Sequence, residues 1–180
     1  SILTFLAAFA VAHGASAQVA KARIDKAADL PRFEYRIDGK VEGLLADPAT
    51  FAAFSAAVKL NPRHADARVG LGAVLARQGR ATEAIAHYRE ALLIAPSNAM
   101  AHNNLGLALL GVDRPEDAAA AFGEAVRLDP RFGQAYIGLA AALNRLGRVA
   151  EARAALEQAL RVDPANEPAR RGLEALAGAR

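Results

Sequence analysis

Residues 99–130, AMAHNNLGLALLGVDRPEDAAAAFGEAVRLDP, set a pattern that recurs over most of the chain. The closing proline, Pro130, belongs to a series in which Pro62, Pro96, Pro130 and Pro164 follow one another at intervals of 34 residues. A fixed period of this length is typical of stacked supersecondary units rather than of a single layered domain.

Further columns repeat in the same register between the prolines. Small residues recur at one column and large apolar residues at another: Gly72, Gly106 and Ala140, then Tyr88, Phe122 and Leu156. We expect the small column to mark where two helices of a pair cross, with Gly72 facing Ala84 and Gly106 facing Ala118. We expect the large residues to fill the wider gap toward the next unit, because overpacking is tolerated only where space exists.

The period, the small-residue columns and the closing proline resemble the tetratricopeptide repeat family. The resemblance covers three full units over residues 65–164 and implies an all-α fold, an α-solenoid of antiparallel helix pairs with a terminal capping helix. One column departs from the family. It often carries tryptophan there, whereas this chain has no tryptophan and holds Arg68, His102 and Tyr136, which predicts weaker packing at the outer end of each first helix.

The pattern divides the chain into a leader, a partial repeat, three full repeats and a cap. The predicted segments are 1–17 (signal peptide), 18–46 (leader with either a short hairpin near Phe33 to Gly39 or an extended segment lying on the helices), 47–64 (partial repeat helix), 65–98, 99–132 and 133–166 (repeats 1 to 3), and 167–180 (capping helix). Predicted helices are 48–60, 65–78, 82–94, 99–110, 115–128, 133–146, 149–162 and 167–177.

The turns within each helix pair carry their own signals. Gly79 and Gly147 end first helices and can take the left-handed conformation that other residues resist. Asp113 stands in that column in the middle unit and predicts a different turn, in which Asp113 caps the helix that begins at Pro115. Asp66 is expected to cap or solvate the start of its own helix.

The first dozen residues are almost wholly apolar and are followed by Ala15-Ser16-Ala17. This arrangement is typical of a secretory signal peptide and predicts cleavage between Ala17 and Gln18, with a periplasmic or secreted mature chain. The alternative is an uncleaved N-terminal helix that anchors the protein in the membrane.

Reactive groups do not converge in this sequence. There is no cysteine, and no two of the four histidines have the i, i+3 or i, i+4 spacing that places two metal ligands on one helix face. Gly70-Leu71-Gly72 lacks the third glycine and the preceding strand of a dinucleotide loop. We therefore expect a protein without a catalytic, metal or cofactor site.

Charge does not favour nucleic acid as a partner. The net charge is +3, from 22 basic and 19 acidic residues, and the two signs are interspersed. No basic run interleaved with aromatic residues occurs, so the basic pI near 9.6 is attributed to solvated helix faces.

The family resemblance implies that the first helices line a concave surface that receives an extended peptide. Carried onto this chain, the partner-binding residues are Val69, Ala73, Arg77, Met100, Asn103, Asn104, Leu107, Gln134, Ile137, Ala141, Asn144 and Arg145, with Ala76 and Leu110 beside them. Asn104 matches the asparagine that holds a peptide backbone in the family, because an amide can donate and accept together.

The subset of the family that grips a C-terminal carboxylate uses a cluster of Lys, Asn and Arg. The corresponding columns here hold Val69, Ala73, Asn104, Gln134 and Gly138, so only the asparagine is retained. An acidic chaperone tail is therefore not the expected ligand.

Three functions are compatible with these features. The favoured one is a non-catalytic scaffold that binds a partner protein or an extended peptide outside the cytoplasm. The alternatives are the repeat region of a larger secreted enzyme or envelope assembly complex, and an oligomer in which the apolar surface packs on a copy of itself.

Overall fold

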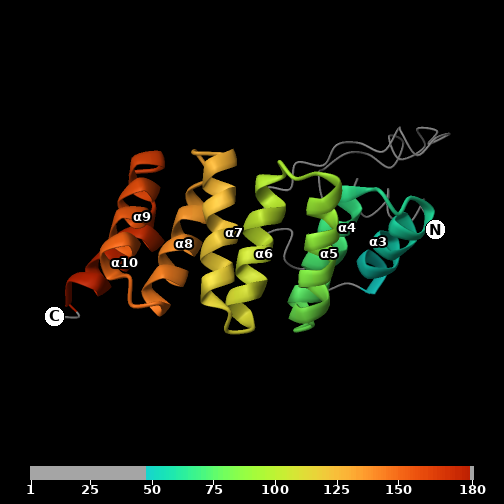
Figure 1. Ribbon diagram of the computed structural model, residues 1–180, viewed down its shortest axis with the longest axis horizontal. Coiled ribbons are helices and arrows are strands. Elements are labelled where there is room, and N and C mark those ends of the chain that lie inside the picture. Colours follow the sequence, from blue (N-terminus) through green and yellow to red (C-terminus); the bar gives the residue numbers. More distant parts are fainter. Residues whose placement is uncertain (1–47, 179–180) are drawn as a thin grey trace. The chain divides into compact units, whose positions relative to one another are not determined.

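The computed structural model describes residues 48–178, which form eight α-helices joined by short turns (Figure 1). The chain divides into two units, Ser1–Ile94 and Ala95–Arg180. The first unit contains α3 (Pro48–Leu60), α4 (Ala65–Arg77) and α5 (Ala81–Ile94). The second contains α6 (Ala99–Gly111), α7 (Pro115–Leu128), α8 (Gly133–Arg145), α9 (Val149–Val162) and α10 (Glu167–Gly178).

Within each unit, helices that follow one another along the chain pack together, and in the second unit the first helices α6 and α8 also touch. In the first unit α3 packs on α4 and α4 on α5; in the second, α6 packs on α7 and α8, α7 on α8, α8 on α9 and α9 on α10. The expected all-helical fold is confirmed, and every described helix begins and ends within one residue of its predicted bounds. The predicted signal peptide and the hairpin near Phe33 lie outside the described residues.

A buried ring set against glycine joins the helices of the second unit. Phe122 of α7 is fully buried, and its ring lies against two glycines, Gly106 of α6 and Gly138 of α8. A Cβ added at Gly106 would lie 2.8 Å from Cζ of the ring, and one at Gly138 only 2.3 Å from Cε1. The ring therefore fills the space that a side chain at Gly106 or Gly138 would need. The sequence predicts Ala118 opposite Gly106, but the side chain nearest to Gly106 is that of Phe122.

The same contact recurs elsewhere in each unit. In the first, a Cβ at Gly70 would lie 2.3 Å from the Phe54 ring and one at Gly72 would lie 2.7 Å from the Tyr88 ring, not against Ala84. In the second, Leu156 of α9 takes this role and lies 2.9 Å from a Cβ placed at Gly172 of α10.

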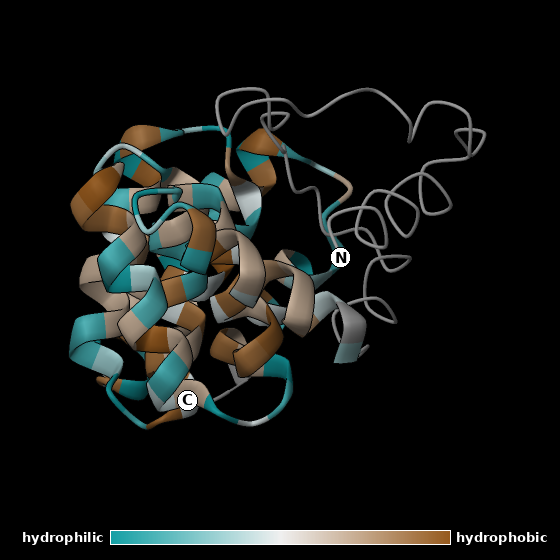
Figure 2. Ribbon diagram, turned by 90° about the vertical axis from the view of Figure 1, so that its right-hand side faces the viewer, coloured by the Kyte–Doolittle hydropathy of each residue, from teal (hydrophilic) through white to brown (hydrophobic). Residues whose placement is uncertain are grey.

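Small residues surround these large side chains and allow the close approach. Beside Leu156, the core of α8, α9 and α10 consists of Ala140, Leu143, Ala152, Ala155, Ala159 and Ala169. Polar residues remain on the outer sides of the helices, so single helices show both brown and teal segments in Figure 2. Amphipathic helices of this kind are stabilised mainly by packing of the apolar side.

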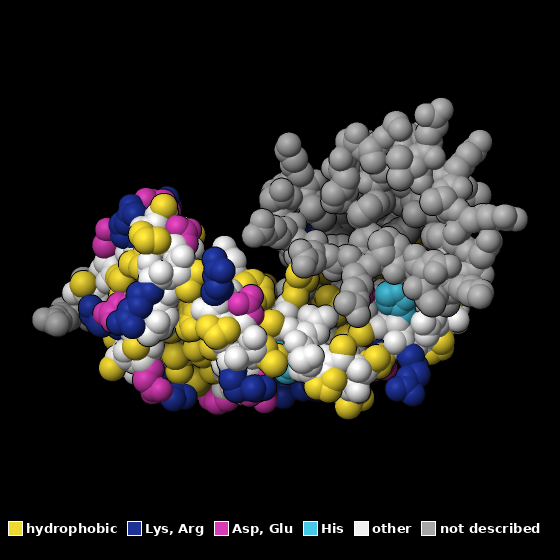
Figure 3. Space-filling view, turned by 90° about the horizontal axis from the view of Figure 1, so that it is seen from above, with side chains coloured by type: hydrophobic (Ala, Val, Ile, Leu, Met, Phe, Trp, Pro, Cys, Tyr) yellow, Lys and Arg dark blue, Asp and Glu magenta, His cyan; other side chains and the backbone are white. Residues whose placement is uncertain are grey.

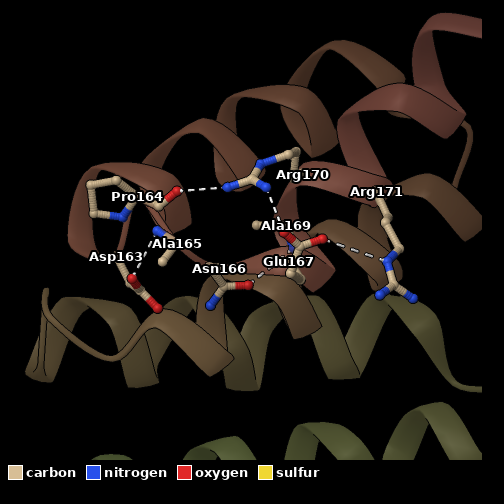
Figure 4. Close-up of polar contacts among 8 residues, drawn as sticks. All are labelled: Asp163, Pro164, Ala165, Asn166, Glu167, Ala169, Arg170 and Arg171. Atoms are coloured by element: carbon tan, nitrogen blue, oxygen red, sulfur yellow. Dashed lines mark hydrogen bonds and ion pairs between the residues drawn. The ribbon is translucent and has the colours of Figure 1, made fainter.

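The first helices begin with a side-chain cap at a repeated position. Nδ1 of His64 accepts a hydrogen bond from the backbone N–H of Ala67 at 3.2 Å. The amide oxygens of Asn98 and Asn166 do the same for α6 and α10, the latter visible in Figure 4. The cap of α4 is thus His64 and not Asp66. The N-cap residue of α8 is Phe132, whose side chain cannot accept a hydrogen bond and makes no cap.

In the column that often holds tryptophan in the family, three side chains hydrogen-bond to the turn before their helix. Arg68 donates from Nε to the carbonyl oxygen of Pro62 at 2.8 Å, and Arg170 donates to that of Pro164 at 3.2 Å (Figure 4). A ring nitrogen of His102 lies 3.0 Å from the Pro96 oxygen.

The turns within the helix pairs share one conformation. Gly79 and Gly147 have φ of 76° and 71°, as expected, and Asp113 has φ of 56°. Asp113 therefore adopts the same left-handed conformation, which is sterically less favourable for a residue with a Cβ than for glycine. The predicted capping role was wrong, because Arg114 holds the N-cap position of α7 and makes no side-chain cap.

We expect Gly138→Ala to lower the free energy of unfolding by about 1–3 kcal/mol, because the buried Phe122 ring has no space to move away from the new methyl group. The control is Gly123→Ala in α7, where nothing lies within 4 Å of an added Cβ. That change should stabilise by about 0.5–1 kcal/mol through helix propensity. Urea unfolding monitored by circular dichroism measures both, and a shift of both variants in the same direction would contradict the assignment.

The cap of α4 gives a second test. His64→Ala should cost about 1 kcal/mol, because the N–H of Ala67 loses its acceptor. His64→Asn reproduces the residue found at Asn98 and Asn166, and should stay within about 0.5 kcal/mol of the wild type. Thermal unfolding at neutral pH compares the three proteins; equal losses for both variants would show that the ring contributes by packing and not as a cap.

Candidate functional site

In the first unit, the predicted partner-binding residues lie along α4 with different exposure. Val69 is buried, Ala73 is half-buried, and Arg77 is exposed in the last turn of the helix. Of these three, only Arg77 is exposed.

In the second unit, α6 contributes Met100, Asn103, Asn104 and Leu107, whose spacing places them on one side of a helix. Met100 is half-buried and both asparagines are only 7% exposed. Leu107, by contrast, is 53% exposed, whereas Leu105 and Leu109 of the same helix are buried and Leu110 is half-buried. Leu107 therefore forms an apolar contact point at the surface of α6.

The two asparagines are bonded to each other. Nδ2 of Asn103 donates to Oδ1 of Asn104 at 3.3 Å, and Oδ1 of Asn103 is buried without a hydrogen-bond partner. Among the described residues, Asn103 and Asn104 are the two polar residues that are buried. Sequence reasoning selected both residues but missed their mutual bond. The available signal was that Asn103 stands in a column with Val69 and Ile137.

The adjacent helix α8 carries most of the exposed polar side chains of this surface. Gln134, Ala141, Asn144 and Arg145 are exposed, and Ile137 is half-buried. The two helices of the second unit that carry predicted residues, α6 and α8, pack on each other. Figure 3 shows basic and acidic side chains interspersed with apolar ones over the α8–α10 region.

Arg145 holds α8 to the end of α6. One guanidinium nitrogen donates to the backbone oxygen of Leu110 at 3.0 Å and lies 3.6 Å from Oδ1 of Asp113. The Arg145 side chain is 52% exposed, so part of its donor set still faces solvent. Its charge is partly balanced by Asp113, and a ligand carboxylate would have to compete with that carboxylate.

The carboxylate-gripping cluster is absent from these columns of the structure. In the second unit, Asn104, Gln134 and Gly138 supply neutral groups or none, and in the first unit Val69 and Ala73 supply only apolar atoms. Without a cation at these positions, a terminal carboxylate would lose hydration without gaining a charged partner.

Two of the described histidines make local contacts at helix starts and turns. His64 caps α4 and His102 contacts Pro96, as above. His87 of α5 lies 4.0 Å from Glu90, and burial lowers the pKa of its imidazole, which favours the neutral ring. Over residues 48–178, no three acidic or histidine side chains are grouped so that they could hold a metal ion.

No helix within residues 48–178 has the length and the apolar run needed to cross a bilayer.

Comparison with solved structures gives neighbours that are tetratricopeptide repeat proteins. The first TPR of Spaghetti (RPAP3), bound to the HSP90 peptide SRMEEVD, is 26% identical with a TM-score of 0.63, covering 64% of this chain and 91% of that one. The second TPR domain of human RPAP3, in complex with the HSP70 peptide SGPTIEEVD, is 25% identical with a TM-score of 0.61, covering 63% and 94%.

A third neighbour, MamA, shares the fold over more of the chain. It is 21% identical with a TM-score of 0.71, covering 82% of this chain and 85% of that one. No curated protein matches the sequence. The sequence model described as Tetratricopeptide repeat matches residues 52–99 and 103–167. The chain belongs to the tetratricopeptide repeat family.

Proposed function

We propose that this protein is a non-catalytic interaction scaffold whose first helices bind an extended segment of a partner protein. The observation that carries the proposal is the surface of α6 and α8, where the exposed Leu107 stands beside hydrogen-bonding amides. Apolar area next to a few placed polar groups is typical of binding sites. The fold neighbours that hold HSP90 and HSP70 peptides support peptide binding as the mode.

The chemistry of the peptide differs from that of those neighbours. Their peptides, SRMEEVD and SGPTIEEVD, both end in EEVD, in which three of the four residues are acidic. In this chain the columns that would grip a carboxylate are neutral, and Arg145 already faces Asp113. We therefore propose an apolar ligand segment, recognised without dependence on a free C-terminal carboxylate.

The test uses an immobilised library of ten-residue peptides, each made with a free and with an amidated C-terminus. We expect the wild-type protein to bind apolar sequences equally well in both forms. Leu107→Ser should weaken this binding about tenfold, because roughly half of a leucine side chain no longer becomes buried on association.

The matched control is Leu93→Ser on α5, since Leu93 is 83% exposed but lies on a second helix. It should leave binding unchanged, and circular dichroism should show both variants folded. Loss of binding in Leu93→Ser with retention in Leu107→Ser would move the site to the second helices. Binding that requires the free carboxylate would contradict the proposed ligand class.

We further propose that the chain is exported, with cleavage between Ala17 and Gln18. The apolar first dozen residues and the small residues Ala15 and Ala17 support this. Intact-mass measurement of the protein recovered from outside the cytoplasm should give a chain that begins at Gln18. A mature species that retains residues 1–17 would instead support an N-terminal membrane anchor.

A further inference from the structure

Two leucines of the first unit are exposed at the ends of their helices. Leu60, the last residue of α3, is 70% exposed, and Leu93, in the last turn of α5, is 83% exposed, the highest values among the large apolar residues that the structure describes. The column of Leu93 holds Lys59, Arg127 and Arg161 in the other second helices. The repeat pattern therefore does not account for a leucine at this position.

The side chain of Arg68 places the two leucines at the same end of the first unit. Its Nε donates to the carbonyl oxygen of Pro62, two residues after Leu60, at 2.8 Å. Its guanidinium also forms an ion pair with Glu90, three residues before Leu93. One side chain thus joins the turn after α3 to the C-terminal part of α5. Exposed apolar residues that gather in this way, rather than singly, mark interaction surfaces.

Unpaired cations accompany both leucines. Lys59 precedes Leu60 and Arg63 follows it in the next turn, while Arg89 precedes Leu93 by four residues and so lies on the same side of α5. All three cationic residues are exposed. None of them takes part in an ion pair within the part of the chain that the structure describes. Their charges are therefore available to a partner.

The described carboxylates at this end leave it positively charged. Glu90 is held by Arg68. Asp66 is half-buried in the first turn of α4, where the helix dipole favours a negative charge. With Arg68 counted, four cations stand against these two carboxylates. The expected partner is therefore anionic as well as able to take up apolar side chains.

A lipid surface satisfies both requirements. Leucine side chains can enter the headgroup region while cations are attracted to anionic lipids, and the long stems of lysine and arginine let their charged groups stay at the level of the phosphates. The three unpaired cations come from a helix end, a turn and a second helix. A protein partner would need a carboxylate placed for each of them, whereas a bilayer supplies negative charge without a fixed arrangement.

We propose that the docking end of the first unit, formed by Lys59, Leu60, Arg63, Arg89 and Leu93, binds the surface of an anionic lipid bilayer. The leucines insert among the headgroups and the cations lie against lipid phosphates. The binding is reversible, because so small an apolar area does not approach the hold of a membrane-spanning helix. This inference is independent of the proposed peptide binding, whose carrying surface belongs to the second unit.

A single fluorescent label tests the docking. The chain contains no cysteine, so Leu60→Cys in the full chain can carry one nitrobenzoxadiazole dye, an apolar group that reports its surroundings. We expect its emission to shift to the blue with vesicles of phosphatidylglycerol and phosphatidylcholine in equal parts. The shift should be absent with phosphatidylcholine alone and should be lost in molar salt, which screens the charges.

A label in the second unit is the control for insertion by another part of the chain. Val149→Cys at the start of α9, where the native valine is 42% exposed, carries the same dye and should show no shift. Insertion of the apolar first dozen residues alone would bring the chain to neutral vesicles as well as to anionic ones. Dependence on anionic lipid at residue 60 therefore separates the docking end from that segment.

Substitutions in the Leu60→Cys labelled protein test the other docking residues. Leu93→Ser should raise the lipid concentration of half-maximal shift about tenfold, because the leucine side chain no longer leaves water. Arg89→Glu should raise it more than about fivefold, because an attraction to the lipid becomes a repulsion. Arg161→Glu makes the same charge change on α9 and should leave it nearly unchanged. Circular dichroism should show all three variants folded.

Several results would overturn the proposal. These are no shift with anionic vesicles, an equal shift with neutral vesicles, or a shift that neither Leu93→Ser nor Arg89→Glu weakens. Equal weakening by Arg161→Glu and Arg89→Glu would show an effect of net charge and not of the docking end. A shift of the same size with polyglutamate and no vesicles would make an acidic protein surface the partner in place of a bilayer.

Discussion

The structure depends on large side chains that lie against glycines, where the missing Cβ leaves room for them. Phe122 of α7 shows the constraint most fully, because its ring lies against Gly106 of the preceding helix α6 and against Gly138 of the following helix α8. One side chain therefore fixes two helix crossings at once. Close helix approach also explains how an alanine-lined core can be stable: the buried side chains are small, but they leave few gaps.

Much of this architecture could be predicted from the sequence, because the repeat supplies several independent readings of each position. Helix bounds and the left-handed turns at Gly79 and Gly147 follow from local chemistry. Two details do not. The ring against Gly106 depends on how two helices cross, and the turn at Asp113 shows that context can impose a positive φ on a residue with a Cβ.

The candidate site was predictable only as a set of positions. The family pattern selects Asn104 and Leu107, but periodicity says nothing about how the amide of Asn104 is hydrogen-bonded. The bond from Nδ2 of Asn103 to Oδ1 of Asn104 joins consecutive side chains and arises only because the usual glycine is replaced. Arg145 illustrates the same limit: its contact with Leu110 comes from α8 lying on α6, a tertiary relation between residues 35 apart.

The start of α8 differs from the starts of α4, α6 and α10, because no side chain caps its backbone N–H groups. Phe132 offers no side-chain acceptor, so the N–H of Ala135 bonds to the Phe132 backbone oxygen at 3.0 Å, and both Phe132 and Tyr136 are half-buried. Partial burial of these two rings accompanies the missing polar cap, and the hydrophobic effect that favours such burial is non-directional. Amide protons in this turn should exchange with solvent sooner than those at the starts of α4, α6 and α10, making it the first place where the second unit opens.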